Sequence, residues 1–429
     1  MKWITVTFAL ITLFTEAAFA QPLPPAENTI YDSDTNHLWN RLNETLFERT
    51  AQDGKKYGLD ELDILYWVRT TNLLSGVSHQ RAMAVLNKFI NSHGEKLIQD
   101  PLKRALLQRD LWELFDWSAG TSFYPVNISG HHDLLTGQFS EECRELQSRL
   151  ALVIRRLALT TNEIASLPDN YAQAETKDLP DLPRGLFQTN GDWVSVGNKD
   201  DSLTAPMHAS RFNGHSVFCV MVHLPDGRQA AIDYLNRLRS FTPIWDDDHE
   251  LNLDLPQFPT NTEWALVRRM CVIDTEGRIQ LTPVTESVQI RHYSEIKGMS
   301  RSPDAQQLFE FELDKRQEGA LRAIGHDEKD FLGVHFLGQG MDGFEITITS
   351  EHDSAALQDV ELKTCIECHS PRGIFSVSSY TQSFPVPSDS QPPANLIPLD
   401  INREVTGTID WKHRQSDWRL LQGLWNQEN

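Results

Sequence analysis

The chain has 429 residues and 40% of them are hydrophobic, so it is long enough for two or three domains and can bury a sizeable core. Its formal net charge of −21 argues against a protein that binds nucleic acid or an anionic membrane surface. The same charge would suit a basic protein partner, although it also serves simple solubility. Composition indicates no particular oligomeric state.

The first twenty residues have the organisation of a secretory signal peptide. Lys2 supplies the positive charge, residues 3–14 form a short apolar run, and residues 18–20 read Ala-Phe-Ala, a typical cleavage site. The apolar run is too short to cross a bilayer, although an uncleaved anchor is the alternative reading. We therefore expect cleavage after Ala20 and a periplasmic or secreted chain with no stable membrane span.

The next segment, residues 21–36, is rich in proline and is expected to form a flexible lead. From 37 to 165 the spacing of apolar residues predicts a helical domain. Asp100 and Pro101 form a helix start signal. Another helix is expected to begin at Ser140, because apolar positions then recur every three or four residues: Cys143, Leu146, Leu150, Val153, Ile154 and Leu157.

The middle of the chain changes character. Residues 166–215 are rich in Pro, Asp, Asn and Gly, which predicts a linker or long loops. Residues 216–350 contain short apolar runs separated by turn residues, which predicts a mixed α+β domain. We expect β-hairpins at 217–234 and 264–282 and a helix at 303–323. The predicted fold class is therefore α+β, with several domains.

The tail, residues 351–429, carries the most informative motif. Cys365-Ile366-Glu367-Cys368-His369 reads C-x-x-C-H, the spacing at which two thiols bond to the vinyl groups of a haem and the histidine reaches the iron. A redox disulfide is an alternative, but residues 370–373 (Ser-Pro-Arg-Gly) predict a turn rather than the helix such a site needs. A zinc site is another, but a closed site needs a second pair of ligands. We predict one covalent haem c in an irregular segment, followed by a final helix at about 416–425.

This motif resembles the haem-attachment motif of c-type cytochromes. The resemblance implies that Cys365 and Cys368 form thioether bonds and that His369 is the proximal iron ligand. The chain differs from small soluble cytochromes, because the motif comes late and no methionine follows it. Residues 108–112 and 418–425 are similar to stretches of uncharacterised exported bacterial proteins that also carry C-x-x-C-H, a similarity that implies no activity.

The sixth iron ligand separates the functions that such a haem can have. His413 is the only histidine after the motif and Met341 is a methionine before it, so both are candidates. Either would complete a low-spin electron carrier. Without such a ligand the iron would suit a peroxidase-like enzyme or a gas sensor, and a structural haem in a binding module is a third possibility. Arg372 is a candidate partner for a haem propionate.

Electron transfer with a basic redox partner protein is the leading expectation, while enzymatic activity stays undecided. Export supports it, because covalent haem attachment to this motif in bacteria occurs outside the cytoplasmic membrane. Three cysteines lie outside the motif. Cys219 and Cys271 occupy strand-like runs and could form a disulfide in an oxidising compartment. Cys143 lies on the apolar face of a helix and is predicted to be a buried free thiol.

Overall fold

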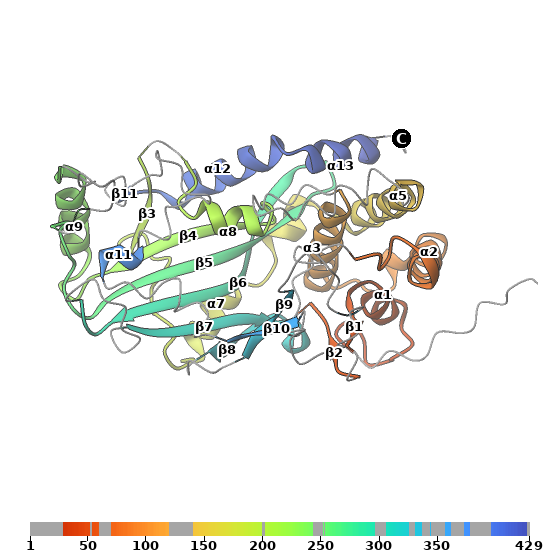
Figure 1. Cartoon of the computed structure of the whole chain (residues 1–429), viewed down its shortest axis with the longest axis horizontal. Helices are drawn as coiled ribbons and strands as arrows, with labels where there is room; N and C mark the ends of the chain where they lie inside the picture. Colours follow the sequence, from red (N-terminus) through yellow and green to blue (C-terminus); the bar gives the residue numbers. More distant parts are fainter. Residues whose placement is uncertain are drawn as a thin grey trace, which may run out of the picture.

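The computed structural model describes residues 29–51, 54–59, 70–119, 140–199, 202–242, 252, 254–296, 306–325, 331–336, 344, 357–361, 373–377 and 396–426. These residues form an α+β architecture, as the sequence predicts. A twisted antiparallel sheet of seven strands runs through the molecule, with one group of helices at one end and other helices on both faces (Figure 1).

The helices are α1 (Leu38–Phe47), α2 (Gly76–Asn91), α3 (Pro101–Ser118), α5 (Ser140–Leu157), α6 (Thr161–Ala165), α7 (Asn170–Thr176), α8 (Pro206–Arg211), α9 (Arg228–Ser240), α11 (Ile374–Val377), α12 (Ile401–His413) and α13 (Ser416–Asn426). Two short 3-10 helices are η2 (Gly94–Lys96) and η4 (Lys315–Gln317). Among the residues that the structure describes, no helix is long and apolar enough to cross a membrane.

The strands are β1 (Arg49–Thr50), β2 (Lys56–Tyr57), β3 (Val194–Asn198), β4 (Ser216–His223), β5 (Thr262–Ile273), β6 (Ile279–Tyr293), β7 (Gln306–Asp314), β8 (Ala320–Gly325), β9 (Phe331–Phe336), β10 (Leu357–Glu361) and β11 (Leu396–Pro398). The large sheet has the order β11-β3-β4-β5-β6-β7-β8, and all neighbouring strands are antiparallel. Two smaller sheets pair β1 with β2 and β9 with β10.

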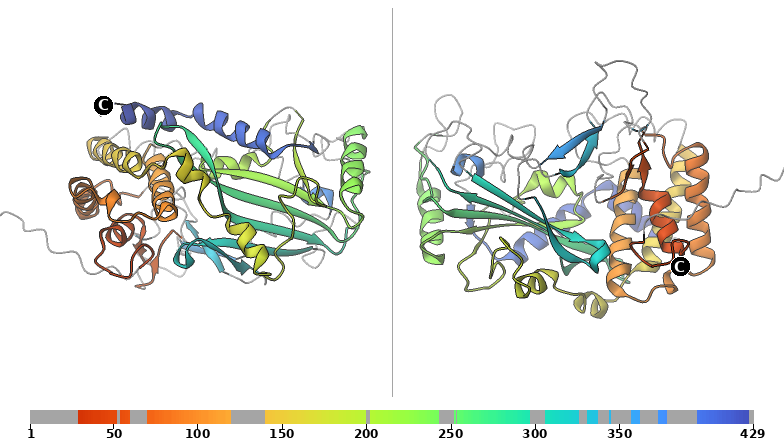
Figure 2. Two further views of the ribbon diagram at one scale, coloured as in Figure 1. Left: turned by 180° about the vertical axis from the view of Figure 1, so that it is seen from behind. Right: turned by 90° about the horizontal axis from the view of Figure 1, so that it is seen from below.

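Both faces of the large sheet carry buried side chains. One strand contributes to both faces, because its successive side chains point to opposite sides. On β4, Cys219 lies in one core and its neighbour Val220 in another. We call the first side face A and the second face B. Face A packs against α7 and α12, and face B packs against α8, α9 and α11. Figure 2 shows α7 on the opposite side of the sheet from α8 and α11 in Figure 1.

The helices α1, α2, α3 and α5 share a continuous core with face A. The buried side chain of Gln108 joins α3 to both α5 and β5. Its Nε2 donates to the carbonyl oxygens of Ile154 at 3.2 Å and Ile273 at 2.8 Å, and its Oε1 accepts from the Ile273 N–H at 2.9 Å. One amide therefore satisfies three backbone groups that would otherwise be buried without partners.

Several helix predictions are confirmed. Asp100 is the N-cap of α3, and its Oδ1 accepts from the Leu102 N–H at 2.8 Å, with Pro101 in the first turn. The helix α5 begins at Ser140, and α13 begins at Ser416. The strands expected at 217–224 and 264–273 correspond to β4 and β5.

The hairpin predicted at 217–234 is wrong in its second half, which is the helix α9. After the turn at Gly227, where φ is 82°, the buried residues are Ala231, Tyr234, Leu235 and Leu238. This spacing of three to four residues is helical, and it becomes visible only over the full thirteen residues of α9. The hairpin at 264–282 is confirmed as β5 and β6.

The helix predicted at 303–323 is also wrong. The described part of this range forms β7 and β8, joined by a turn in which Glu318 and Gly319 both have positive φ. β7 completes its hydrogen bonds with β6 on one side and with β8 on the other. Pairing in the sheet therefore overrides a local composition that favours a helix.

The regions expected to be irregular contain further regular elements. Residues 166–215 include α7, α8 and β3, which is an interior strand of the sheet rather than a linker. The tail adds β11 and α12 to the predicted final helix. In the expected flexible lead, Tyr31 is buried and its backbone N–H donates to the Asn40 side chain at 3.0 Å.

Replacing Gln108 with Met should lower the free energy of unfolding by about 2–3 kcal/mol, because the apolar side chain leaves buried backbone groups of Ile154 and Ile273 without partners. Urea denaturation measures this difference. The exposed Gln80 of α2 provides the control, and Gln80→Met should change stability by about 0.5 kcal/mol or less. Equal effects of the two substitutions would show that Gln108 does not join the helices to the sheet.

Candidate functional site

Five residues predicted to form the haem site, Cys365, Cys368, His369, Arg372 and Met341, lie outside the residues that the structure describes. The described elements on both sides of the motif are β10 and α11. β10 pairs with β9, which in turn contacts β8 at the edge of the large sheet. Figures 1 and 2 both place β10 and α11 on the same side of that sheet.

Chain length limits how far the motif can lie from these two elements. Cys365 is four residues after Glu361, the last residue of β10, and His369 is four residues before Gly373, which directly precedes α11. A fully extended chain spans at most about 3.6 Å per residue, so each end of the motif lies within about 14 Å of a described anchor. The described elements that border the motif in the sequence are therefore β10 and α11.

The anchor after the motif, α11, is held firmly on face B. Ile374 is buried, and its backbone N–H donates to Gln257 Oε1 at 2.9 Å. The Ser376 hydroxyl hydrogen-bonds the hydroxyl of Tyr293, and its carbonyl oxygen accepts from Arg291 Nη1 at 3.4 Å. Both Tyr293 and Arg291 belong to β6 and are fully buried. A central strand of the sheet thus fixes the chain directly after the motif.

His413, the other candidate for the sixth iron ligand, is the last residue of α12 and is exposed. Its ring packs beside Trp418, with 5.5 Å between the ring centroids. The neighbouring Lys412 is completely buried and fixes this end of the helix. Coordination of the iron by His413 stays a prediction.

The cysteines outside the motif are all free and buried, as predicted for Cys143. The possible disulfide between Cys219 and Cys271 is absent, because Cys219 lies opposite Val267 and Cys271 lies opposite Leu281 in the sheet. Burial raises the pKa of Cys143 and of Cys219 to about 12 and also raises that of Cys271. These thiols therefore stay protonated and unreactive at neutral pH.

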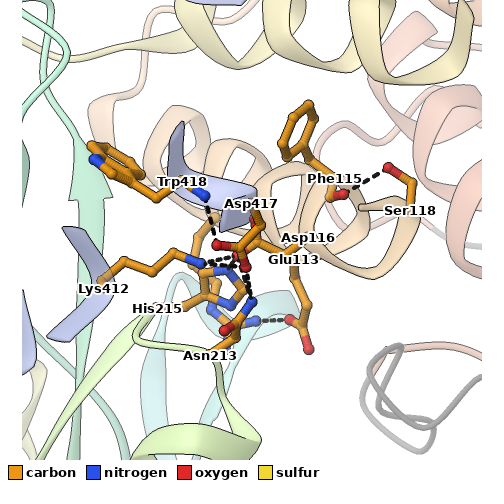
Figure 3. A network of polar contacts seen from close by, with 10 residues as sticks. Glu113, Phe115, Asp116, Ser118, Asn213, His215, Lys412, Asp417 and Trp418 are labelled. Atoms are coloured by element: carbon orange, nitrogen blue, oxygen red, sulfur yellow. Dashed lines mark hydrogen bonds and ion pairs between the residues drawn. The ribbon is translucent and has the colours of Figure 1, made fainter. Parts of the chain in front are cut away.

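The densest polar site among the described residues is a buried cluster between α3, β4, α12 and α13 (Figure 3). Asp116 comes from α3, Lys412 from α12 and Asp417 from α13, while Asn213 and His215 lie in the turn before β4. All five side chains are at most 2% exposed. We call these five residues the ionic cluster.

Asp116 Oδ2 is the centre of the ionic cluster. It accepts from Asn213 Nδ2 at 3.0 Å, from the Lys412 ammonium group, and from His215 Nε2 at 2.6 Å. Lys412 Nζ also lies 3.0 Å from Asp417 Oδ2, and Asn213 donates to the same carboxylate. One lysine and one amide therefore bridge two carboxyl groups that come from different helices.

The turn before β4 approaches α12 closely enough to require glycine. Gly214 has a φ of 73°, and a Cβ atom at this position would lie 3.0 Å from the Cβ of Lys412. On the other side, Trp112 of α3 covers the cluster, with its ring centroid 4.5 Å from that of His215 and 5.6 Å from Lys412 Nζ. The cluster is thus closed off from water by tight packing.

Burial controls the protonation of the cluster. Burial and the nearby Asp417 raise the pKa of Asp116 well above its usual value, with opposition from Lys412. Burial, followed by the positive charges of Lys412 and Arg109, lowers the pKa of His215 well below its usual value. His215 is therefore neutral at physiological pH, and its Nε2–H donates to Asp116.

A second group of buried charges adjoins the ionic cluster through Ser216, the residue after His215. Ser216 donates to Glu286, and Arg109 binds both Glu286 at 2.9 Å and Glu113. Burial alone would raise the pKa of Glu286, but Arg109 and Arg268 lower it. The neighbouring pair of Lys315 and Asp110 extends this group, with Lys315 Nζ 2.8 Å from Asp110 Oδ2.

Sequence reasoning missed the ionic cluster because its members are far apart in the chain. One local signal was available: Arg109, Glu113 and Asp116 recur at helical spacing within α3 and so share one face. The ionic cluster can hold helices together and bind protons. Because it is completely buried, a substrate cannot reach it.

A row of three side chains crosses face A at the opposite end of the strands. His223, Glu263 and His292 are direct neighbours on β4, β5 and β6, and each histidine Nδ1 lies 3.2–3.4 Å from a Glu263 oxygen. This row does not converge on a single point, and the described part of the chain holds no group of three His, Cys, Asp or Glu residues suited to a metal ion. Comparison with known protein families, with curated proteins and with solved structures returns no match.

Replacing Lys412 with Met should lower the free energy of unfolding by about 3–5 kcal/mol, because the carboxyl groups of Asp116 and Asp417 then lose their shared buried cation. Guanidinium denaturation at neutral pH measures this loss. Lys88→Met on the exposed side of α2 is the matched control and should change stability by about 0.5 kcal/mol or less. A loss below about 1 kcal/mol for Lys412→Met would contradict the role given to this lysine.

Proposed function

We propose that the chain is an exported c-type haem protein that carries one covalent haem and transfers electrons. The observation that carries the proposal is the C-x-x-C-H motif, in which Cys365 and Cys368 would hold the haem and His369 would bind its iron. Residues 1–20, with their features of a signal peptide, support export to the compartment where such haems are attached.

The donor set fits an iron porphyrin better than the alternatives. Two thiolates at this spacing and an adjacent imidazole match covalent haem, whereas a closed zinc site would need a fourth ligand that the motif does not provide. When bound, the haem supplies a one-electron redox centre. The element that follows the motif in the sequence supports a fixed attachment for that centre, because α11 is tied to β6 through Ser376.

The acidic composition supports a basic protein as the redox partner. The net charge of −21 would attract a positively charged partner to the chain. This attraction would weaken as the ionic strength rises. Arg372, next to the motif, is proposed as a partner for a haem propionate.

A haem with an open coordination position, as in a peroxidase or a gas sensor, is the second candidate. Two observations favour it: no methionine follows the motif, and the only later histidine, His413, packs against Trp418 at the surface. Electron transfer instead requires that His413, Met341 or another residue binds the iron as its sixth ligand.

The double variant Cys365→Ala/Cys368→Ala should abolish covalent pigment, because both thioether bonds are then lost. Protein is expressed in a host that has the haem-attachment machinery, and pigment is measured by the pyridine haemochrome spectrum after extraction with acidified organic solvent. Cys143→Ala is the matched control, because Cys143 is a buried free thiol, and it should retain its pigment. Pigment that survives extraction in the double variant would contradict the attachment site.

Carbon monoxide distinguishes the two candidate functions. An electron carrier should show a low-spin spectrum that CO leaves unchanged in the ferrous form, because two protein ligands occupy the iron. His413→Ala and Met341→Ala are compared, and the variant that removes the sixth ligand should become able to bind CO. Rapid CO binding by the unmodified protein would overturn the electron-transfer proposal in favour of an open site.

A further inference from the structure

The ionic cluster contains more negative than positive charge if all of its carboxyl groups are ionised. Asp116 and Asp417 would contribute two negative charges and Lys412 one positive charge, while His215 is neutral. All of these side chains are fully buried, so water cannot compensate for the remaining charge. An uncompensated buried charge is among the most costly features that a protein interior can contain.

Hydrogen bonding shows where this imbalance can be relieved. Asp116 Oδ2 takes the donors from Asn213, His215 and Lys412, whereas Asp116 Oδ1 is buried without a hydrogen-bond partner among the described residues. A negative oxygen in that position would have neither water nor a donor. Asp417 differs, because its Oδ1 accepts from the Trp418 backbone N–H at 2.5 Å.

We propose that Asp116 holds a proton on Oδ1 at neutral pH, and that release of this proton to solvent at alkaline pH loosens the attachment of α12 and α13. With the proton in place, Lys412 and Asp417 form one balanced ion pair. Without it, two carboxylates from different helices face each other across a single lysine. The repulsion acts between α3 and α13, and so it opposes the docking of the C-terminal helices.

The charged surroundings support a proton on Asp116. His215 before β4, Lys412 of α12 and Asp417 of α13 face Asp116 itself, while Arg109 and Glu113 of α3 act on the neighbouring His215. Arg109 is engaged by Glu113 and by Glu286 of β6. Lys412 is therefore the cation that contacts Asp116 directly, and it is shared with Asp417.

The shifted pKa values of Asp116 and His215 decide how the ionic cluster makes stability depend on pH. The raised pKa of Asp116 means that above its usual pKa of 3.8 the folded chain holds a proton that the unfolded chain has lost, so stability falls as pH rises. The lowered pKa of His215 makes stability rise with pH, but only up to its usual pKa of 6.5. Of these two groups, only Asp116 still changes stability with pH above 6.5.

Hydrogen exchange measured by mass spectrometry between pH 6.5 and 9.5 tests the proposal on the full chain. After correction for the intrinsic exchange rate, opening of α12 and α13 should increase about tenfold per pH unit until the proton is released, because one proton is linked to opening. In Asp116→Asn, whose amide imitates the neutral acid, this increase should disappear. Peptides from α2 serve as the internal reference and should not share the increase.

Asp410→Asn, an exposed substitution on α12, is the matched control and should keep the pH dependence of the unmodified protein. The same slope in Asp116→Asn and in the unmodified protein would overturn the proposal. Infrared spectroscopy of the unmodified protein provides a measurement that needs no variant. A carboxylic-acid C=O band should be present at neutral pH and should vanish over the pH range in which α12 and α13 open, and its absence at neutral pH would equally overturn the proposal.

Discussion

The burial of Lys412 between Asp116 and Asp417 is the constraint on which the arrangement of the chain depends. It joins a helix from the first third of the sequence to the two last helices, and it does so next to the start of β4. A buried ion pair seldom adds net stability over a well-packed apolar contact, because both charges lose their hydration. Its effect is to specify one position for α12 and α13, since any displacement leaves a charge buried without a partner.

The described elements that follow the motif in the sequence are held by the large sheet. The chain reaches α12 through β11, which pairs with β3 at the edge of the large sheet, and it leaves the motif through α11 on face B. β10, which precedes the motif, pairs with β9 in a separate small sheet.

The parts of the fold that could be predicted from the sequence are those with strong local signals. Asp100-Pro101 marks the start of α3, a regular apolar spacing marks α5, and the apolar runs at β4 and β5 mark central strands. Prediction failed where the decisive interactions are distant. β7 is a strand because β6 supplies hydrogen bonds to it. β3 lies in a polar region of the sequence that predicts a loop, and it is a strand because it pairs with β4. The ionic cluster unites residues that are up to about 300 positions apart, and local spacing shows only the charged face of α3 that contributes Asp116.

The central claim is that an exported chain carries a haem bonded to Cys365 and Cys368, and mass spectrometry of purified protein from a host with haem-attachment machinery tests it directly. The intact mass should correspond to a chain that begins at Gln21 and carries one haem, and the proteolytic peptide with both cysteines should retain that haem after denaturation. An unmodified peptide with two free thiols, or with a disulfide between them, would contradict the claim.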